Sequence, residues 1–362
     1  MSSHFIALSD LHLGYDHTLL GSRGAQENLA EMLADLCSGE TDRLILNGDT
    51  FEGCVPYTAG QVDDCGYSPA MADAGRNFFE AIVSKVRIRD LIIVWGNHDY
   101  AVWKKLAADC GVSTFTNNCR DDVVLQKGGH VLGGAGDFLD DVVGPARSKL
   151  GLIKSAYPNY ILGSGWPYLV FHHGHFLDDL VLGQDPEIEY EALRLLTGHG
   201  RPDVNINDEL TLEALHTKTD AFIASTWELN SKARQLEWSM IRRSEKNPKC
   251  SFYPTCVPGA LPVPSTEPQD PQLGHRAPWY ANLLTADPTT PPPIGPLDTP
   301  SYLFIGHDHA GGFADFTGMD GAAWKYVNTG GWTNDRGSNA VHGHVTVWLK
   351  DEMAPSIHCV AV

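Results

Sequence analysis

The chain has 362 residues, of which 43% are hydrophobic and 20% are charged, and its formal net charge is −19 at pH 7. The apolar fraction and nine Trp are enough for a sizeable core, which excludes a largely disordered chain. The acidic excess argues against general nucleic-acid binding, because such binding depends on Lys and Arg. A chain of this length can form one large globular domain or two domains of ordinary size.

The first residues and the cysteines indicate a cytoplasmic protein. Residues 4–9 read as a strand, with neither the basic region nor the apolar core of a signal peptide. No apolar run approaches the roughly 18 residues of a membrane span. The eight Cys include no C-x-x-C pair, so we expect reduced thiols. The oligomeric state stays open.

Strand-like and helix-like segments alternate in the first half of the chain. Strands are predicted at residues 4–9, 43–47 and 91–95, and helices at 24–37 and 71–87. This alternation predicts βαβ units with right-handed crossovers. In open sheets of this kind, ligands lie beyond the carboxyl ends of the strands.

The elements are shorter after residue 120. We expect a helical piece near 139–154 and a strand at 167–172. Strand patterns return at 301–305, 324–328, 342–349 and 356–361. The simplest organisation is one core made of residues 1–175 and 301–362.

Residues 176–300 are predicted to form a cap inserted into that core. The part at 185–248 is polar and mostly helical in period. The part at 254–300 holds 13 of the 22 prolines and almost no periodicity, so we expect an irregular loop or an extended arm.

Five short clusters of Asp, Asn and His stand where predicted strands end. They are Asp10-Leu-His12, Gly48-Asp49, Gly96-Asn97-His98-Asp99, His173-Gly174-His175 and Gly306-His307-Asp308-His309. Carboxylate oxygen, amide oxygen and imidazole nitrogen are ligands of divalent ions that activate water, and a pair of ions needs a bridging group. Asp10 and His12 alternate on an extended segment and can reach one ion. Together the clusters indicate a two-metal hydrolase.

Each cluster taken alone also has a structural explanation. D-x-H after a strand is typical of a cap and turn, and Gly-Asp is a common turn. Gly-His-Asp-His is more specific, because three ionisable residues after a buried strand need partners. All five clusters, in this order and at strand ends, favour a single site.

The ordered set D-x-H, G-D, G-N-H-D, H-G-H and G-H-x-H resembles the motifs of the calcineurin-like metallophosphoesterases. The resemblance implies an α/β (α+β) fold, a four-layer αββα sandwich of mixed sheets, here with a helical and proline-rich cap insertion. It implies that Asp10, His12, Asp49 and His309 hold one ion, and that Asp49, Asn97, His173 and His307 hold the other. His172 and His175 flank the fourth ligand, and the pattern favours His173. We expect two divalent ions, Mn²⁺ first, with Zn²⁺, Fe²⁺ or Mg²⁺ as alternatives.

Differences from the motifs of two branches of the family narrow the range of expected substrates. The run Gly48-Asp49-Thr50-Phe51-Glu52 differs from the Gly-Asp-x-Val-Asp-Arg-Gly of protein serine/threonine phosphatases, and Glu52 stands where purple acid phosphatases place a Tyr ligand. SDLHLG, NGDTFE and HGHFLDD are similar to the UDP-2,3-diacylglucosamine hydrolase branch, which often carries Arg where His98 stands. We therefore expect hydrolysis of a phosphodiester or pyrophosphate bond in a small phosphorylated substrate, nucleotide-linked or lipid-linked.

In the expected reaction, a hydroxide that bridges the ions attacks phosphorus in line with the leaving oxygen. His98 is the candidate for protonating or stabilising the leaving group, with Asp99 or Asp64 orienting it; the alternative is a structural turn histidine. In the cap, Arg242 and Arg243 could bind a second phosphate, although a solvated helix face would look the same.

Three other functions fit parts of the pattern. A phosphomonoesterase would share every motif. A DNA exonuclease of the repair-nuclease branch shares D-x-H-L-G, but the acidic charge and the lack of a coiled-coil insert argue against it. A catalytically silent binding scaffold would lack ligands, whereas all seven are present. His342 and His344 alternate on a predicted strand, where they could approach a third ion or lie on the surface.

Overall fold

The computed structural model describes residues 5–15, 18–52, 69–99, 102–103, 119–120, 138–157, 159–162, 167–175, 271–286, 299–307, 311–318, 321–332, 342–349 and 352–361. The predictions for Asp64, Arg242, Arg243 and His309, and for most of the cap at 176–300, concern residues outside these ranges.

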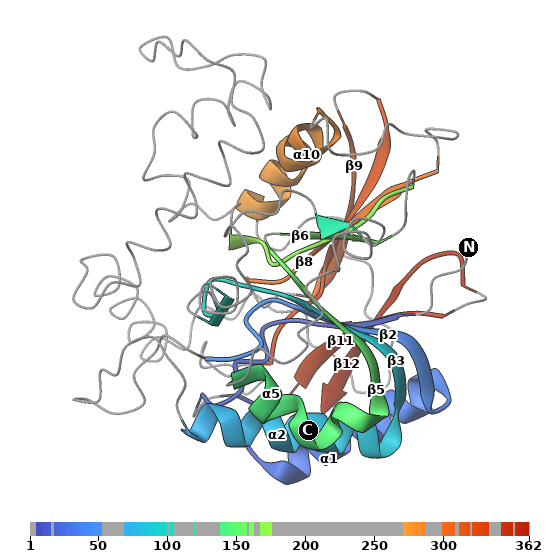
Figure 1. Ribbon diagram of the computed structural model, residues 1–362. Helices are drawn as coiled ribbons and strands as arrows, with labels where there is room; N and C mark the ends of the chain where they lie inside the picture. Colours follow the sequence, from blue (N-terminus) through green and yellow to red (C-terminus); the bar gives the residue numbers. More distant parts are fainter. Residues whose placement is uncertain are drawn as a thin grey trace, which may run out of the picture.

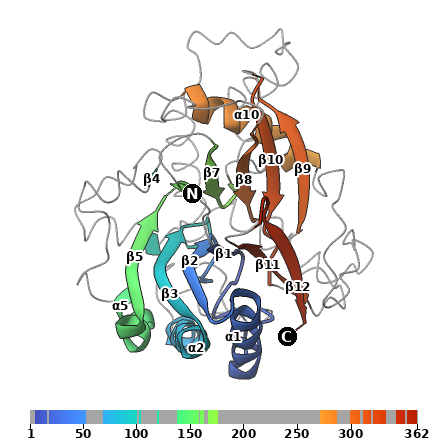
Figure 2. The ribbon, with the colours of Figure 1, turned by 90° about the vertical axis from the view of Figure 1, so that its right-hand side faces the viewer.

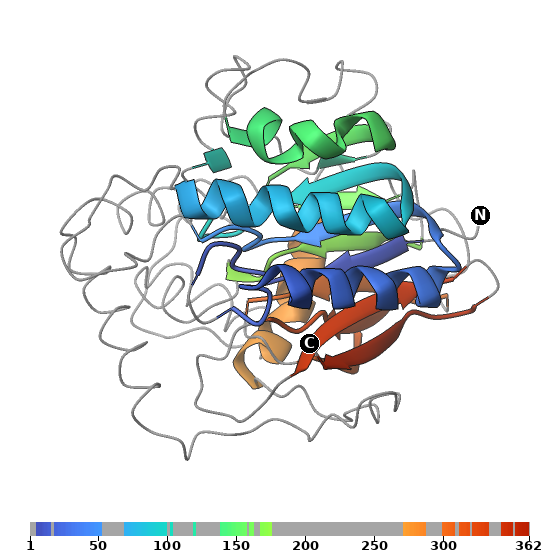
Figure 3. The same ribbon diagram turned by 90° about the horizontal axis from the view of Figure 1, so that it is seen from below.

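Two six-stranded sheets are stacked face to face, and helices cover the outer side of each (Figure 1). Helices α1 (Arg23–Cys37), α2 (Pro69–Lys85) and α5 (Phe138–Val143) lie on the first sheet. Helix α10 (Pro271–Ala286) lies on the second sheet, and α1 and α2 run side by side (Figure 3). The layers form an αββα sandwich, which confirms the predicted fold class.

The first sheet has the order β12-β11-β1-β2-β3-β5, visible edge to edge in Figure 2. Its strands are β1 (Phe5–Leu8), β2 (Glu40–Asn47), β3 (Arg87–Val94), β5 (Leu150–Ala156), β11 (His342–Trp348) and β12 (Ser356–Ala361). The strands β1, β2, β3 and β5 are parallel, whereas β11 runs antiparallel to β1. The carboxyl ends of the four parallel strands therefore share one edge.

The second sheet has the order β4-β6-β7-β8-β10-β9. Its strands are β4 (Cys119–Arg120), β6 (Asn159–Leu162), β7 (Leu169–His172), β8 (Ser301–Ile305), β9 (Gly312–Thr317) and β10 (Ala323–Asn328). The strands β7, β8 and β10 are parallel, so His172, Ile305 and Asn328 end at a common edge.

An aromatic cluster joins the two sheets. The ring centroid of Phe5 lies 5.2 Å from that of Phe171 and 5.4 Å from that of Phe304. Ile6 and Leu8 belong to the larger apolar cluster that includes the helices, so β1 is buried on both faces. Burial on both faces explains the uninterrupted apolar run of this strand.

Three expectations are corrected by the structure. The predicted helical piece at 139–154 is α5, then a 3₁₀ helix η1 (Gly144–Lys149), and then strand β5. Residues 271–286 form α10 instead of an irregular arm, and Asn159 Nδ2 donates a hydrogen bond to Tyr280 Oη at 3.0 Å. Cys359 is disulfide-bonded, which makes the expectation of reduced thiols wrong for that residue; Cys37 is free.

Within the described ranges, no helix is long and apolar enough to cross a membrane.

Candidate metal centre

The loops that follow β1 and β2 run alongside each other and carry three predicted ligands. The amide of Asp10 donates to Gly48 O and that of His12 to Asp49 O, both at 2.9 Å. Asp10, His12 and Asp49 have left-handed φ values of 53°, 44° and 48°. His307 adopts φ 72°, so four of the five non-glycine residues with positive φ in the described chain are predicted ligands. Such strain of roughly 1–3 kcal/mol per residue persists where the surroundings impose it and is typical of functional sites.

Glycine precedes three of the ligands because each glycine lies against a ligand from another cluster. A Cβ at Gly96 would overlap Asp49 Oδ1. The corresponding clashes are Gly48 with the His173 ring and Gly306 with Asp10 Oδ2. The glycines of the motifs thus make room for interlocking side chains.

One group of ligands converges on the Nε2 atom of His173. This atom lies 3.0 Å from Asp49 Oδ2, 3.1 Å from Asn97 Oδ1 and 3.3 Å from His307 Nδ1. The other ring nitrogen, Nδ1, faces the carbonyl oxygen of Asn47 at 3.3 Å. A histidine held through Nδ1 by a carbonyl presents Nε2 to a metal. The arrangement brings together all four residues expected to hold the second ion.

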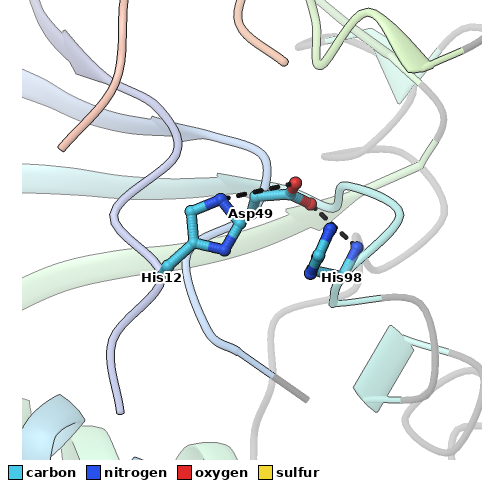
Figure 4. Close-up of side chains that lie close together, drawn as sticks. All are labelled: His12, Asp49 and His98. Atoms are coloured by element: carbon cyan, nitrogen blue, oxygen red, sulfur yellow. Dashed lines mark hydrogen bonds and ion pairs between the residues drawn. The ribbon is translucent and has the colours of Figure 1, made fainter. Parts of the chain in front are cut away.

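A second group consists of His12, Asp49 and His98 (Figure 4). His12 Nε2 lies 3.8 Å from Asp49 Oδ2, and the backbone N–H of His98 donates to Asp49 Oδ1 at 2.9 Å. Asp49 belongs to both groups, as a bridging ligand must. Burial favours its protonated form, but the rings of His173, His98 and His12 hold the pKa of Asp49 well below its usual range.

Asp10 lies between the two sheets. The amide of His307 donates to both of its carboxylate oxygens, at 3.1 and 3.0 Å. Asp10 Oδ1 is 3.9 Å from His173 Nε2, and Asp10 is fully buried. Asp10 could therefore bind an ion from the side of the first sheet, while His173 and His307 would bind from the side of the second sheet.

Glu52 lies within the candidate centre, although the sequence analysis gave it no role there. Its carboxylate lies 2.7 Å from His12 Nδ1 and 2.9 Å from His98 Nδ1, and Glu52 is only 3% exposed. Burial opposes ionisation, but His98 and His12 lower the pKa of Glu52 far below its usual value. Burial also opposes the charge on His12, whose pKa is nonetheless raised by its hydrogen bond to Glu52. The sequence feature that could have pointed to Glu52 is its place three positions after the predicted ligand Asp49, because a carboxylate buried there needs partners.

Asp99 braces the loops around the site. Its carboxylate accepts hydrogen bonds from the amides of Thr50 at 3.0 Å, Phe51 at 2.7 Å and Gly96 at 3.2 Å. Burial, and then the charge of Asp49, raise the pKa of Asp99 to about 7. The sequence analysis offered Asp99 or Asp64 as the partner that orients the His98 ring, and Asp64 lies outside the described residues; in the structure, Glu52 contacts this ring.

His172 and His175 pack beside the centre. The ring of His175 stacks on those of Tyr157 and His172, with centroids 6.0 and 5.5 Å apart. Burial lowers the pKa of His175 well below its usual value, so this histidine is neutral. Among the three histidines, His173 is the one whose ring nitrogen meets Asp49, Asn97 and His307, in keeping with the sequence-based choice.

The donor set fits a binuclear divalent centre. Buried carboxylate and amide oxygens together with imidazole nitrogens suit Mn²⁺, Zn²⁺, Fe²⁺ or Mg²⁺, and no thiolate takes part among the residues described here. Two three-residue groups share one carboxylate, which is the arrangement that a pair of ions requires.

Comparison with known proteins agrees with this geometry. A family model described as calcineurin-like phosphoesterase matches residues 3–249. No curated protein matches the chain. A solved structure of a dimetal phosphatase from Danio rerio is 14% identical, with 99% of this chain and 96% of that chain covered and a TM-score of 0.32. A similarity that weak supports no conclusion by itself. The match to residues 3–249 shows that the chain belongs to the calcineurin-like phosphoesterase family and is a metal-dependent phosphoric ester hydrolase.

Proposed function

We propose that this phosphoesterase cleaves a phosphodiester or pyrophosphate bond of a small substrate, nucleotide-linked or lipid-linked. The observation that carries the proposal is the position of His98. Its backbone N–H binds the shared ligand Asp49, and its ring is held by Glu52. An alkoxide or phosphate leaving group is strongly basic or highly charged, so a proton donor beside the metal ligands lowers the barrier to its departure.

The ligands would be Asp10, His12, Asp49, Asn97, His173, His307 and His309, with Mn²⁺ as the expected metal. When bound, two divalent ions lower the pKa of water and withdraw charge from the phosphoryl oxygens. The chain itself supplies the proton. Protonated His98 donates Nδ1–H to Glu52 and Nε2–H to the leaving oxygen, and it becomes neutral when that second proton is transferred.

The cap at 176–300 is proposed to select the substrate. Arg242 and Arg243 would bind a second phosphate of a pyrophosphate or nucleotide, because the guanidinium fork matches phosphate oxygens. Three predictions stand beside this one. They are a core made of residues 1–175 and 301–362, a cytoplasmic location, and membership of the UDP-2,3-diacylglucosamine hydrolase-like branch.

The test is hydrolysis of bis-p-nitrophenyl phosphate with and without Mn²⁺ by the wild type and by Asp49→Asn. We expect metal-dependent turnover that the variant loses. The matched control is Asp315→Asn, which changes an exposed carboxylate on β9 that pairs with Lys325. Turnover of p-nitrophenyl phosphate alone would replace the diester proposal with a phosphomonoesterase.

The leaving group tests the role of His98 separately. His98→Gln should lose more rate with a dialkyl phosphodiester, which expels an alkoxide, than with an alkyl p-nitrophenyl phosphodiester, which expels p-nitrophenolate, because p-nitrophenolate departs without protonation. Equal losses with both leaving groups would refute proton donation by His98.

A further inference from the structure

The His344 side chain of β11 lies between the two sheets, near the edge that carries the ligands. The antiparallel ladder pairs Thr346 with Ala7, so continuing its register places His344 opposite Ser9, the residue before Asp10. His344 is 9% exposed. A buried ring at this position belongs to the interior, which excludes the surface position that the sequence left open.

Two glycines that flank strands of the second sheet border the His344 ring. A Cβ at Gly311 would lie 2.6 Å from His344 Cδ2 and 3.0 Å from Nε2. A Cβ at Gly330 would lie 2.5 Å from Nδ1 and 2.6 Å from the Cβ of His344, and Gly330 has φ +69°. Because real Cβ atoms do not approach this closely, both positions require glycine as long as the ring is there.

Gly311 precedes β9, and Gly330 follows β10. Gly330 lies in the turn 328–332, whose carbonyl at Gly330 accepts a hydrogen bond from Ser9 Oγ at 2.5 Å. In the same turn, Trp332 N donates to the carbonyl oxygen of Asp10 at 3.1 Å. The amide of Thr329 in this turn donates to the carbonyl oxygen of Ile305 at 2.7 Å, two residues before His307. A shift of the His344 ring against Gly330 would therefore reach both His307 and Asp10 through the turn.

We propose that His344 is a positioning residue for the metal centre. Its ring packs against Gly311 and Gly330 and thereby fixes the turn 328–332, which is hydrogen-bonded to Ile305 before His307 and to the carbonyl of Asp10. The inference depends on the metal centre alone and holds whichever phosphate ester is the substrate. It assigns His344 a packing role in place of a ligand role toward a third ion.

The test measures Mn²⁺ dissociation constants by calorimetry for His344→Ala, His344→Phe, Gly311→Ala and the pair His344→Ala with Gly311→Ala. Residues behind the ligands typically contribute 10- to 100-fold in metal affinity, so we expect His344→Ala to weaken binding about tenfold. His344→Phe keeps a flat ring and should stay within roughly threefold of the wild type. Gly311→Ala should weaken binding because the ring must move.

The double variant gives the sharpest result. The three atoms nearest to a Cβ at Gly311 all belong to the His344 ring, so Gly311→Ala should do no further harm once the ring is removed. Gly330→Ala is the matched control. It should stay harmful in the His344→Ala background, because the His344 Cβ at 2.6 Å remains and φ is positive.

Thermal unfolding in EDTA separates positioning from general packing. Unchanged Mn²⁺ affinity in His344→Ala, with or without a lower unfolding temperature, would overturn the proposal. So would a multiplicative loss of affinity in the double variant. If His344→Ala does not fold, the Mn²⁺ affinity of Gly311→Ala becomes the deciding measurement. A wild-type Mn²⁺ affinity in that variant would overturn the proposal. Metal binding is read without any substrate, so failure here is distinct from failure of the proposed hydrolysis.

Discussion

Replacing Glu52 with Gln should disable two histidines at once. The carboxylate lies 2.7 Å from His12 Nδ1 and 2.9 Å from His98 Nδ1, and it can accept a hydrogen bond from both rings. A Gln side chain has nearly the same shape but only one acceptor oxygen, so one ring must lose its partner or flip its tautomer.

The magnitude follows from the bonds that are lost. A hydrogen bond to a charged group contributes about 1.5–3 kcal/mol. Each 1.36 kcal/mol corresponds to a factor of ten, so one such loss equals roughly 10- to 150-fold. We expect kcat with an alkoxide leaving group to fall about 100-fold through His98. Mn²⁺ affinity should fall about tenfold through His12.

The assay combines Mn²⁺ calorimetry with kcat at saturating Mn²⁺ for Glu52→Gln, His98→Gln and the double variant. His98→Gln should lower kcat and leave the metal affinity near that of the wild type. Glu52→Gln should lower both. In the double variant, kcat should be no lower than in His98→Gln, because both changes act on the same proton transfer.

Two results would refute this reasoning. Wild-type Mn²⁺ affinity in Glu52→Gln would show that the contact with His12 has no effect on the ligand. Fully multiplicative losses of kcat in the double variant would show that Glu52 and His98 act independently. The control is Glu27→Gln, which removes an exposed carboxylate that pairs with Arg23.

Three further outcomes are expected. Gly96→Ala should weaken Mn²⁺ binding more than about 100-fold by calorimetry, because the new methyl group would overlap Asp49 Oδ1; near-normal affinity would contradict the interlocked geometry. Mn²⁺ affinity should fall as pH decreases through the neutral range, because the pKa of His12 is raised and the ring must be neutral to bind metal, so a lower pH makes the ion displace more protons; calorimetry at several pH values checks this, and a flat profile counts against it. EDTA should lower the free energy of unfolding by about 2.7 kcal/mol for each bound ion, relative to protein in free Mn²⁺ at 100 times the dissociation constant. Scanning calorimetry with no difference would show that the ions do not bind the folded site.

The candidate ligands stand out in the sequence because their clusters lie just beyond the ends of apolar strands. Asp10, Asp49 and Asn97 follow β1, β2 and β3, and parallel strands bring their carboxyl ends to one edge. Local sequence suffices for this inference. The choice of His173 over its neighbours rested on motif order, and the contacts of its Nε2 atom agree with it.

Other features depend on contacts that local sequence does not encode. Leu150 and Ile153 have helical spacing, so β5 read as the end of a helix until the sheet provided its partners. Pro278 inside α10 argued against a helix, and packing of Tyr280 against the second sheet overrides that local preference. Glu52 joins His12, which is 40 positions away, to His98, which is 46 positions away. No periodicity reveals such a pairing.

The division of ligands between the sheets has a consequence for the newly made chain. Asp10 is synthesised 297 residues before His307, which follows β8. The strand β11, which pairs with β1, is added later still. We therefore expect a nascent chain that has not yet reached β8 to lack part of the centre and to be inactive.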